Sequence, residues 1–222
     1  MTIQGNFIKR AEDIEETFHL VDFIANIESH RNLPITNPNG SKLFVSQEMQ
    51  CALKAQFLMV LYNIIESTVC DCLNTFYDSI ADDGLTFAEL SDEMRDIWKI
   101  YLKRKSNPDH QKNDTELMGM VICFRSLAVN ISGSLDIRKV IDVFSKHGCN
   151  LDETNRDKYS NSFLVVKNKR NNLAHGNISF SECGSNYMVS DLQKFKEDIL
   201  NGMQEVVNQA KEYISSKKYK RL

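Results

Sequence analysis

The chain has 222 residues, of which 42% are hydrophobic and 26% are charged. This is enough to bury a substantial core within one domain, and nine Gly and three Pro are too few for a loop-rich or all-β protein. The formal net charge of −3 excludes the chain-wide basic field expected of a general nucleic-acid binder, so any affinity for a polyanion must come from local patches.

The six cysteines include no CxxC pair and show no zinc-site spacing, so we expect them to be small buried thiols in a reducing cytosol. Residues 1–13 lack the apolar core of a signal peptide. The longest apolar run, residues 57–65, is interrupted by Tyr62 and Asn63 and is too short to span a bilayer. The sequence therefore predicts a soluble, cytoplasmic protein that needs no membrane, metal or other cofactor.

The first half of the chain shows two strong helical patterns. Within residues 1–31, apolar residues from Phe7 onward recur at spacings of three, four and seven, which predicts an N-terminal amphipathic helix. Residues 33–42 hold two prolines, a glycine and two asparagines, which indicate a loop. A long helix from Ser46 to about Ile80 is apolar around much of its middle, so we expect it to be central.

The middle of the chain is predicted to alternate between helices and polar loops. Thr86 and Glu89 form a capping-box pattern that predicts the start of a helix running to about residue 105. Residues 106–114 are expected to form a polar loop, and the apolar residues 115–129 are predicted to be helical. Residues 132–134, Ser-Gly-Ser, should interrupt the pattern.

The second half is predicted to contain three more helices. A short one should follow Leu135 and end at Gly148, and a longer one should run from about 153 to 175. Residues 178–190 are expected to be an extended loop or a small hairpin. Ser190 and Gln193 form a second capping-box pattern, predicted to open a last helix to about residue 216, followed by a basic, frayed tail over 216–222.

Together these patterns predict one all-α domain over residues 1–222, built as a bundle of six or seven helices. They also place an unusual stretch, VVKNKRNNLAHGNISF, near the end of the helix over 153–175. At about 100° per residue, one stripe of that helix is apolar. The residues of this stripe are Tyr159, Phe163, Val166 and Leu173, and Arg170 falls among them.

An arginine on a core-facing stripe is costly unless it finds an anion, a hydrogen-bonding partner or an opening to solvent. A second stripe brings polar atoms together near the helix end, and its residues are Leu164, Asn168, Asn171 and His175. The Cα atoms of Arg170 and His175 are about 9 Å apart on an ideal helix. Both side chains can therefore reach toward one phosphate, and a second copy of the helix would complete a groove.

These residue types suit RNA cleavage. Histidine exchanges protons near neutral pH, and arginine holds a phosphate and stabilises the charge that develops during transfer. The amide of Asn171 can orient either group. Attack of a ribose 2′-hydroxyl on its own phosphodiester needs no metal when these parts are present.

A structural interpretation remains open. His175 in a last turn can simply interact with the helix C-terminus, and Arg170 can be one partner of a structural ion pair. Spacing alone is not specific, because Arg104 and His110 also form an arginine–histidine pair, across a proline-containing loop, and we assign that pair no role.

The run KNKRNNLAHGNISFSECG resembles the signature of the HEPN superfamily, an Arg-Asn-x3-His motif near a helix end. LYNIIESTV and SGSLDIRKVIDVFSKHG resemble a branch of stand-alone prokaryotic HEPN proteins, so the similarity spans about residues 45–215. The resemblance implies a HEPN-type helical bundle that forms a homodimer with the two motifs along one cleft. Active members are metal-independent endoribonucleases, commonly toxins or antiviral defence effectors.

Carried over onto this chain, the resemblance makes Arg170 and His175 the catalytic pair and Asn171 the supporting polar residue. From charge alone we add Lys167 and Lys169 as contacts to the RNA backbone, with solvated lysines as the alternative. HEPN toxins with nucleotidyltransferase antitoxins often carry a Tyr two residues after the His; Asn177 stands there, which puts that route of control in doubt.

Three hypotheses follow from this pattern. The first is a HEPN endoribonuclease with an RNA substrate, regulated by a neighbour-encoded antitoxin or defence-system partner. The second is a non-catalytic HEPN module that binds RNA or a partner protein, and the third is a structural adaptor. Two further features stay open: Glu66 faces either the site or the rim of the core, and the basic tail either contacts nucleic acid or is solvated.

Overall fold

The computed structural model describes residues 2–27, 34–105, 113–131, 135–152 and 154–221. This part of the chain is mostly helical, and the all-α prediction is confirmed. The α-helices are α1 (Ile3–Ala25), α2 (Gln47–Asp82), α3 (Asp92–Lys105), α4 (Asp114–Leu117), α5 (Ile137–Lys146), α6 (Thr154–Ala174), α7 (Phe180–Ser185) and α8 (Val189–Ser215). A 3-10 turn, η2 (Phe87–Glu89), precedes α3. The predicted loop after α1 contains a two-residue hairpin of β1 (Ile35–Thr36) and β2 (Lys42–Leu43).

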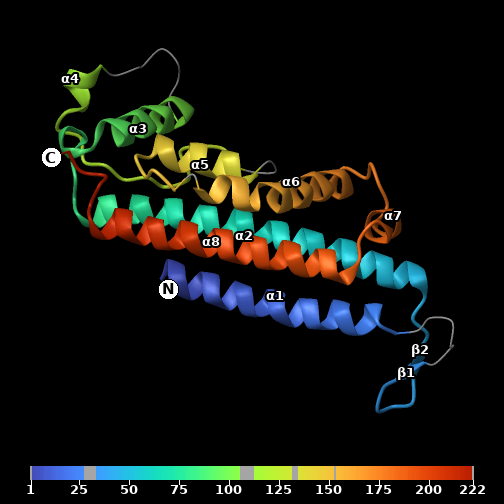
Figure 1. Cartoon of the computed structure of the whole chain (residues 1–222). Helices are drawn as coiled ribbons and strands as arrows, with labels where there is room; N and C mark the ends of the chain where they lie inside the picture. Colours follow the sequence, from blue (N-terminus) through green and yellow to red (C-terminus); the bar gives the residue numbers. More distant parts are fainter. Residues whose placement is uncertain (1, 28–33, 106–112, 132–134, 153, 222) are drawn as a thin grey trace.

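The predicted central helix is confirmed as α2, which lies between α1 and α8 on one side and the layer of α5 and α6 on the other (Figure 1). Its N-cap is Ser46, whose hydroxyl accepts a hydrogen bond from Met49 N–H at 3.2 Å. By length and composition alone, α2 is the one helix in the described chain that is capable of crossing a membrane. However, 56% of the apolar 18-residue window of α2 is buried inside the bundle, which is typical of a core helix.

Helix α6 packs on α2 and α8 through the apolar stripe that its sequence predicts. Tyr159, Phe163, Val166 and Leu173 are all buried. The predicted end of the helix is also confirmed. Gly176 adopts a φ of +68°, its N–H donates to Leu173 O, and Asn177 N–H donates to Asn172 O at 2.9 Å. These are the two hydrogen bonds of a Schellman motif, which fixes the direction in which the chain leaves α6.

The expectation of an extended loop or hairpin over 178–190 is wrong, because this segment contains α7. Ser179 and Glu182 form a capping box in which each side chain receives a hydrogen bond from the other residue's backbone N–H. Helix α7 packs closely on α2, and Gly184 makes this approach possible. A Cβ atom at Gly184 would lie 1.8 Å from the carbonyl oxygen of Cys51, so no side chain fits there.

Three other predicted helices differ from the structure. The Thr86–Glu89 capping box opens the 3-10 turn η2, and α3 begins separately at Asp92. Of residues 115–129, only the first three belong to a helix, the end of α4. The segment then runs extended beside η2, where Phe87 N–H donates to Met120 O and Ile122 N–H donates to Leu85 O, both at 2.9 Å. Helix α8 begins at Val189, with Asp191 accepting from Met188 N–H, rather than at the predicted Ser190–Gln193 box. Residues 106–112 and 132–134, including His110, lie outside the described residues.

The cysteine prediction is confirmed only in part. Cys51, Cys72, Cys149 and Cys183 are buried free thiols, whereas Cys70 is half-buried and Cys123 is exposed.

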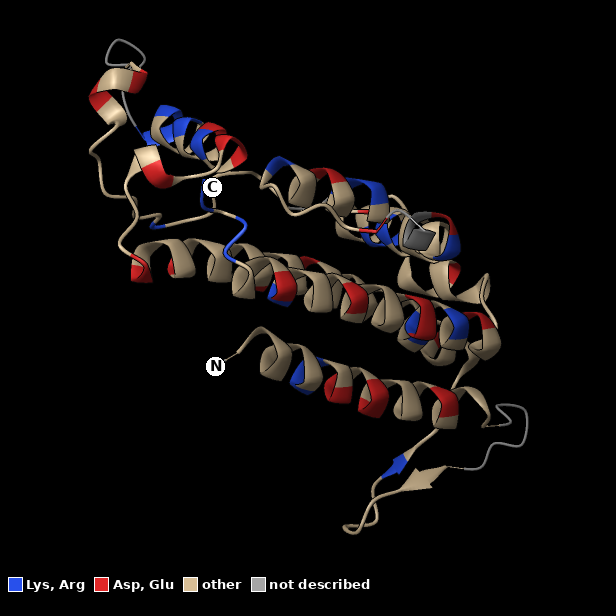
Figure 2. Cartoon of the chain, turned by 60° about the vertical axis from the view of Figure 1, so that its left-hand side comes forward, with Lys and Arg blue, Asp and Glu red and all other residues tan. Residues whose placement is uncertain are grey.

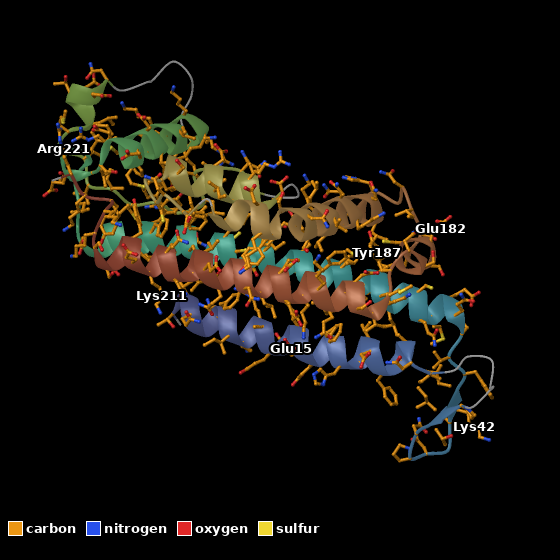
Figure 3. All side chains as sticks on the ribbon, in the orientation of Figure 1. Glu15, Lys42, Glu182, Tyr187, Lys211 and Arg221 are labelled. Atoms are coloured by element: carbon orange, nitrogen blue, oxygen red, sulfur yellow. The ribbon has the colours of Figure 1, made fainter. Side chains whose placement is uncertain are left out.

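The prediction of a frayed basic tail is wrong. Asp83, which follows α2, accepts hydrogen bonds from Lys217 Nζ at 2.8 Å and Tyr219 Oη at 2.9 Å, and it pairs with Lys220 Nζ at 3.1 Å. We call these four residues the tail clamp. Tyr219 is only 2% exposed, and its carbonyl accepts from Ser91 N–H at 2.8 Å. Arg221 lies at the opposite end of the molecule from Glu182 and Tyr187 (Figure 3), so the tail is far from α7.

Candidate functional site

The Arg-Asn-x3-His residues lie on the last two turns of α6, beside α2 and just before α7. Basic and acidic residues are interspersed along the helices instead of gathering on one face (Figure 2). Any affinity for a phosphate must therefore come from a local arrangement, as the net charge of −3 indicates.

The side chain of Arg170 lies against α2 at the edge of the core. Its guanidinium lies 4.7 Å from the ring centroid of Tyr62, and Nη2 is 3.9 Å from Oε2 of Glu66. Nη1 donates a hydrogen bond to Oδ1 of Asn171 at 3.3 Å, and a quarter of the arginine side chain stays exposed. The π face and the nearby carboxylate offset the cost of partial burial. Because 3.9 Å is too long for a hydrogen bond, the guanidinium keeps donors that an incoming anion can use.

Tyr62 and Glu66 are one helical turn apart on α2, so both face α6. The structure thus answers the question left open for Glu66: it faces Arg170. Tyr62 is fully buried, and its hydroxyl accepts a hydrogen bond from Leu135 N–H at 3.2 Å. Burial raises the pKa of the Tyr62 phenol above its ordinary value, and the Glu66 carboxylate raises it further. The ring is therefore a fixed, neutral platform under the guanidinium.

His175 occupies the turn that closes α6, and its imidazole is exposed. Its backbone N–H donates to Asn171 O at 3.1 Å, which holds the last turn together. Asn171 is half-buried, and its amide oxygen already accepts from Arg170. Within the described part of the chain, no hydrogen bond joins the side chains of Arg170 and His175. A single chain therefore presents the two groups side by side without assembling them into one closed site.

The two lysines predicted to contact RNA have different surroundings. Lys167 forms an ion pair of 2.9 Å with Asp136, the N-cap of α5, and both side chains are less than one-fifth exposed. Lys169 lies on the side of α6 toward α7, with Nζ 5.8 Å from the ring centroid of Tyr187. The charge of Lys167 is thus largely balanced within the chain, whereas among the described residues Lys169 has no carboxylate partner.

Sequence reasoning missed two residues that shape this site, Tyr62 and Asp136. The four-residue spacing between Tyr62 and Glu66 on a predicted helix was a readable signal, because it puts both on one face. The pairing of Asp136 with Lys167 joins residues 31 positions apart, and local patterns carry no trace of it. Over the residues that the structure describes, no three His, Cys, Asp or Glu side chains are placed to hold a metal ion.

No curated protein and no solved structure matches the chain. The model of the MAE_28990-like HEPN family matches residues 2–219, which include every helix described above and the Arg170–His175 motif. This match covers nearly the whole chain and agrees with the helical bundle. The chain therefore belongs to the MAE_28990-like HEPN family.

Proposed function

We propose that this protein is a metal-independent endoribonuclease that acts as a homodimer, in the role of a toxin or an antiviral defence effector. HEPN domains are often ribonucleases. The proposal rests on the accessibility of the two motif side chains. A quarter of the Arg170 side chain is exposed and, among the described residues, no carboxylate lies within hydrogen-bonding distance of it, and His175 is exposed at the same end of α6.

The chemistry follows from these positions. The ribose 2′-oxygen attacks the adjacent phosphorus and loses its proton, and the bond from phosphorus to the 5′-oxygen breaks as that oxygen gains a proton. The products are a 2′,3′-cyclic phosphate and a free 5′-hydroxyl. Arg170 would bind the non-bridging oxygens, and Asn171 would orient the guanidinium through its existing hydrogen bond. The imidazoles of the two copies would exchange protons with the 2′- and 5′-oxygens.

The homodimer is part of the proposal, because one chain does not bring both groups onto one target. In a cleft shared by two copies of α6, the exposed His175 of one copy would come near the Arg170 of the other. Size-exclusion chromatography with light scattering tests this directly. A protein that is monomeric at assay concentrations and still cleaves RNA would reject the shared cleft.

The decisive experiment compares Arg170→Ala and His175→Ala with His19→Ala, a control at an exposed histidine on α1. We expect each motif variant to lose about 10²- to 10⁴-fold in RNA cleavage, with unchanged helicity and dimerisation, and the control to keep full activity. Cleavage should persist in EDTA and leave 2′,3′-cyclic phosphate ends. Undiminished cleavage by both motif variants would reject the assignment.

A second candidate is a non-catalytic module that binds RNA or a partner protein. The contacts of Arg170 with Tyr62, Glu66 and Asn171 favour it, because a guanidinium with three partners in its own chain can serve structure alone. Under this hypothesis the purified dimer binds RNA without cutting it, and Arg170→Ala lowers the melting temperature. An antitoxin or defence-system partner encoded nearby would be compatible with either function.

A further inference from the structure

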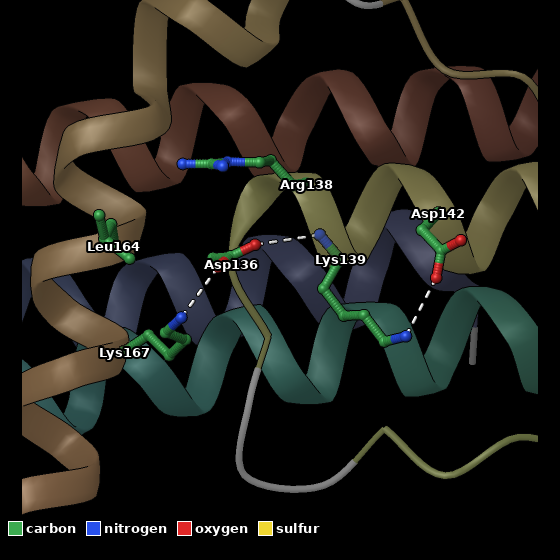
Figure 4. A pocket seen from close by; sticks show the side chains of 6 residues that line it. All are labelled: Asp136, Arg138, Lys139, Asp142, Leu164 and Lys167. Carbon is green, nitrogen blue, oxygen red and sulfur yellow. Dashed lines mark hydrogen bonds and ion pairs between the residues drawn. The ribbon is translucent and has the colours of Figure 1, made fainter.

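A shallow groove of about 550 Å³ lies between α5 and α6, one turn from Arg170. We call it the α5–α6 groove. It is lined by Asp136, Arg138, Lys139, Asp142, Leu164 and Lys167. Figure 4 shows Arg138 extending from α5 toward α6, where Leu164 lies, while the side chain of Lys139 extends away from α6 toward Asp142.

Most charges in this groove balance one another. Lys167 pairs with Asp136 at 2.9 Å, and Lys139 pairs with Asp142 at 3.0 Å. Arg138 is exposed, and its charge helps to lower the pKa of the Asp136 carboxyl, but among the described residues no ion pair or hydrogen bond to a carboxylate is found for its guanidinium. The three basic and two acidic lining residues leave one excess positive charge, and Arg138 is the basic lining residue for which no ion pair is found in the described part of the chain.

The groove lies close to the Arg170 site, because Lys167 is three residues before Arg170 on α6 and Tyr62 contacts both Arg170 and the segment that leads into α5. The ring centroid of Tyr62 lies 4.7 Å from the guanidinium of Arg170. The Tyr62 hydroxyl accepts a hydrogen bond from the N–H of Leu135, the residue immediately before the N-cap of α5. On α6, Leu164 lies on the same stripe as His175, about 16 Å away along the helix axis. A strand bound at the motif and running along this stripe would enter the groove.

The ionic contacts also fix the shape of the groove. Oδ1 of Asp136 caps α5 by accepting from Lys139 N–H at 3.0 Å, while Oδ2 accepts from Lys167 of α6 at 2.9 Å. Burial opposes ionisation of Asp136, but these two hydrogen bonds hold the pKa of its carboxyl below the ordinary value. The carboxylate thus stays charged near neutral pH and joins the two walls.

We propose that the α5–α6 groove binds the phosphodiester backbone of a single-stranded RNA, with Arg138 contacting a phosphate that flanks the one held by Arg170. The choice of RNA rests on the proposed function. A guanidinium whose N–H groups are not engaged by a carboxylate offers paired donors to phosphate oxygens. The lining holds no aromatic side chain, so it offers no platform for base stacking, and binding there is independent of sequence.

The test measures binding of a fluorescently labelled single-stranded RNA by anisotropy, over a range of salt concentrations, in the non-cleaving His175→Ala background. We expect the added change Arg138→Ala to weaken binding roughly 5- to 20-fold and to reduce the slope of log K against log salt by about 0.7, the loss of one phosphate contact. Arg138→Lys should retain the slope. The matched control is Arg125→Ala, at an exposed arginine beside α3.

A reciprocal variant tests the same groove in the opposite direction. Asp136→Asn keeps a side-chain oxygen to cap α5 but removes the charge that balances Lys167. We expect it to bind the RNA several-fold more tightly, with a steeper salt dependence. Circular dichroism and melting curves verify that each variant is folded. Equal affinity and equal slope for Arg138→Ala and its background overturn the proposal.

RNA cleavage and RNA binding in the α5–α6 groove can succeed or fail independently. If the wild-type dimer binds RNA without cleaving it and binding depends on Arg138, the nuclease proposal fails while the groove stands. If the wild-type dimer cleaves RNA and Arg138→Ala changes neither affinity nor slope, the groove proposal fails alone. Absence of any RNA binding in the His175→Ala background also overturns the groove.

Discussion

The buried histidine His147 should make the stability of this protein fall steeply in mild acid. His147 ends α5, is fully buried, and lies between α2 and α8. Val143 O can only accept, so Nδ1 of His147 donates to it at 2.7 Å, and Nε2 accepts from the Tyr77 hydroxyl at 2.8 Å. This arrangement fits the neutral imidazole, and burial lowers the pKa of His147 to about 4.

The sign and size of the effect follow from linkage. In the unfolded chain, a histidine binds a proton as the pH falls below about 6.5. In the folded chain His147 stays neutral until about pH 4, so between these values acid stabilises only the unfolded state. The free energy of unfolding should therefore fall by about 2–3 kcal/mol between pH 7.5 and pH 4.5 through this residue alone. That is a large part of the 5–15 kcal/mol typical of a domain.

The assay is urea unfolding followed by helical circular dichroism at pH 7.5, 6.5, 5.5 and 4.5, for wild type and His147→Gln. The variant does not titrate at this position, so the contributions of carboxylates and exposed histidines cancel in the difference between the two curves. Its stability at pH 7.5 should be lower, but its slope with pH should be shallower. Parallel loss of stability in both proteins would refute the reasoning.

Three further outcomes are expected. Tyr62→Leu removes the aromatic ring under Arg170 and should lower kcat/KM for RNA cleavage roughly 3- to 30-fold, measured at temperatures where the variant is folded. Tyr62→Phe keeps the ring and should stay close to wild type. Gly184→Ala places a methyl group against the Cys51 carbonyl and should reduce the free energy of unfolding, measured by urea titration, by at least about 1–3 kcal/mol. Gly119→Ala is the control: nothing lies within 4 Å of the added atom, so no such loss is expected. Asp83→Asn should release the tail clamp and speed chymotryptic cleavage at Tyr219. Hydrogen bonds from Lys217, Lys220 and Tyr219 lower the pKa of Asp83 to about 2, so the wild-type clamp should persist through mild acid and weaken only as the pH falls from about 4 toward 2, where pepsin replaces chymotrypsin as the probe.

The long helices were predictable because their signals are local. Periodic apolar residues and a Ser46 N-cap define α2 to within about two residues, and Gly176 marks the end of α6. The overlooked helix α7 also had a local signal, the Ser179–Glu182 capping box. The error over residues 115–129 has a different origin. An apolar run without clear period fits a buried extended segment as well as a helix, and its pairing with Phe87 is visible only in three dimensions.

The site was predictable to the same extent. The helical wheel places Arg170 on the apolar stripe and His175 at the helix end, and the structure has both at these positions. The partners of these residues were not predictable, because Tyr62 and Asp136 come from other helices. The basic tail shows the same limit: its composition indicates solvation, but Asp83, 134 positions before Lys217, binds it.

The close contact at Gly184 has a consequence for how the motif meets its target. Because α7 is seated against α2 directly after the Schellman turn, the backbone on both sides of His175 is already ordered in the unbound chain. The conformational entropy of that segment is lost on folding and need not be lost again when a ligand arrives. The backbone that carries His175 is thus preorganised, and a ligand of the kind proposed would have to adapt its own shape to an ordered helix end.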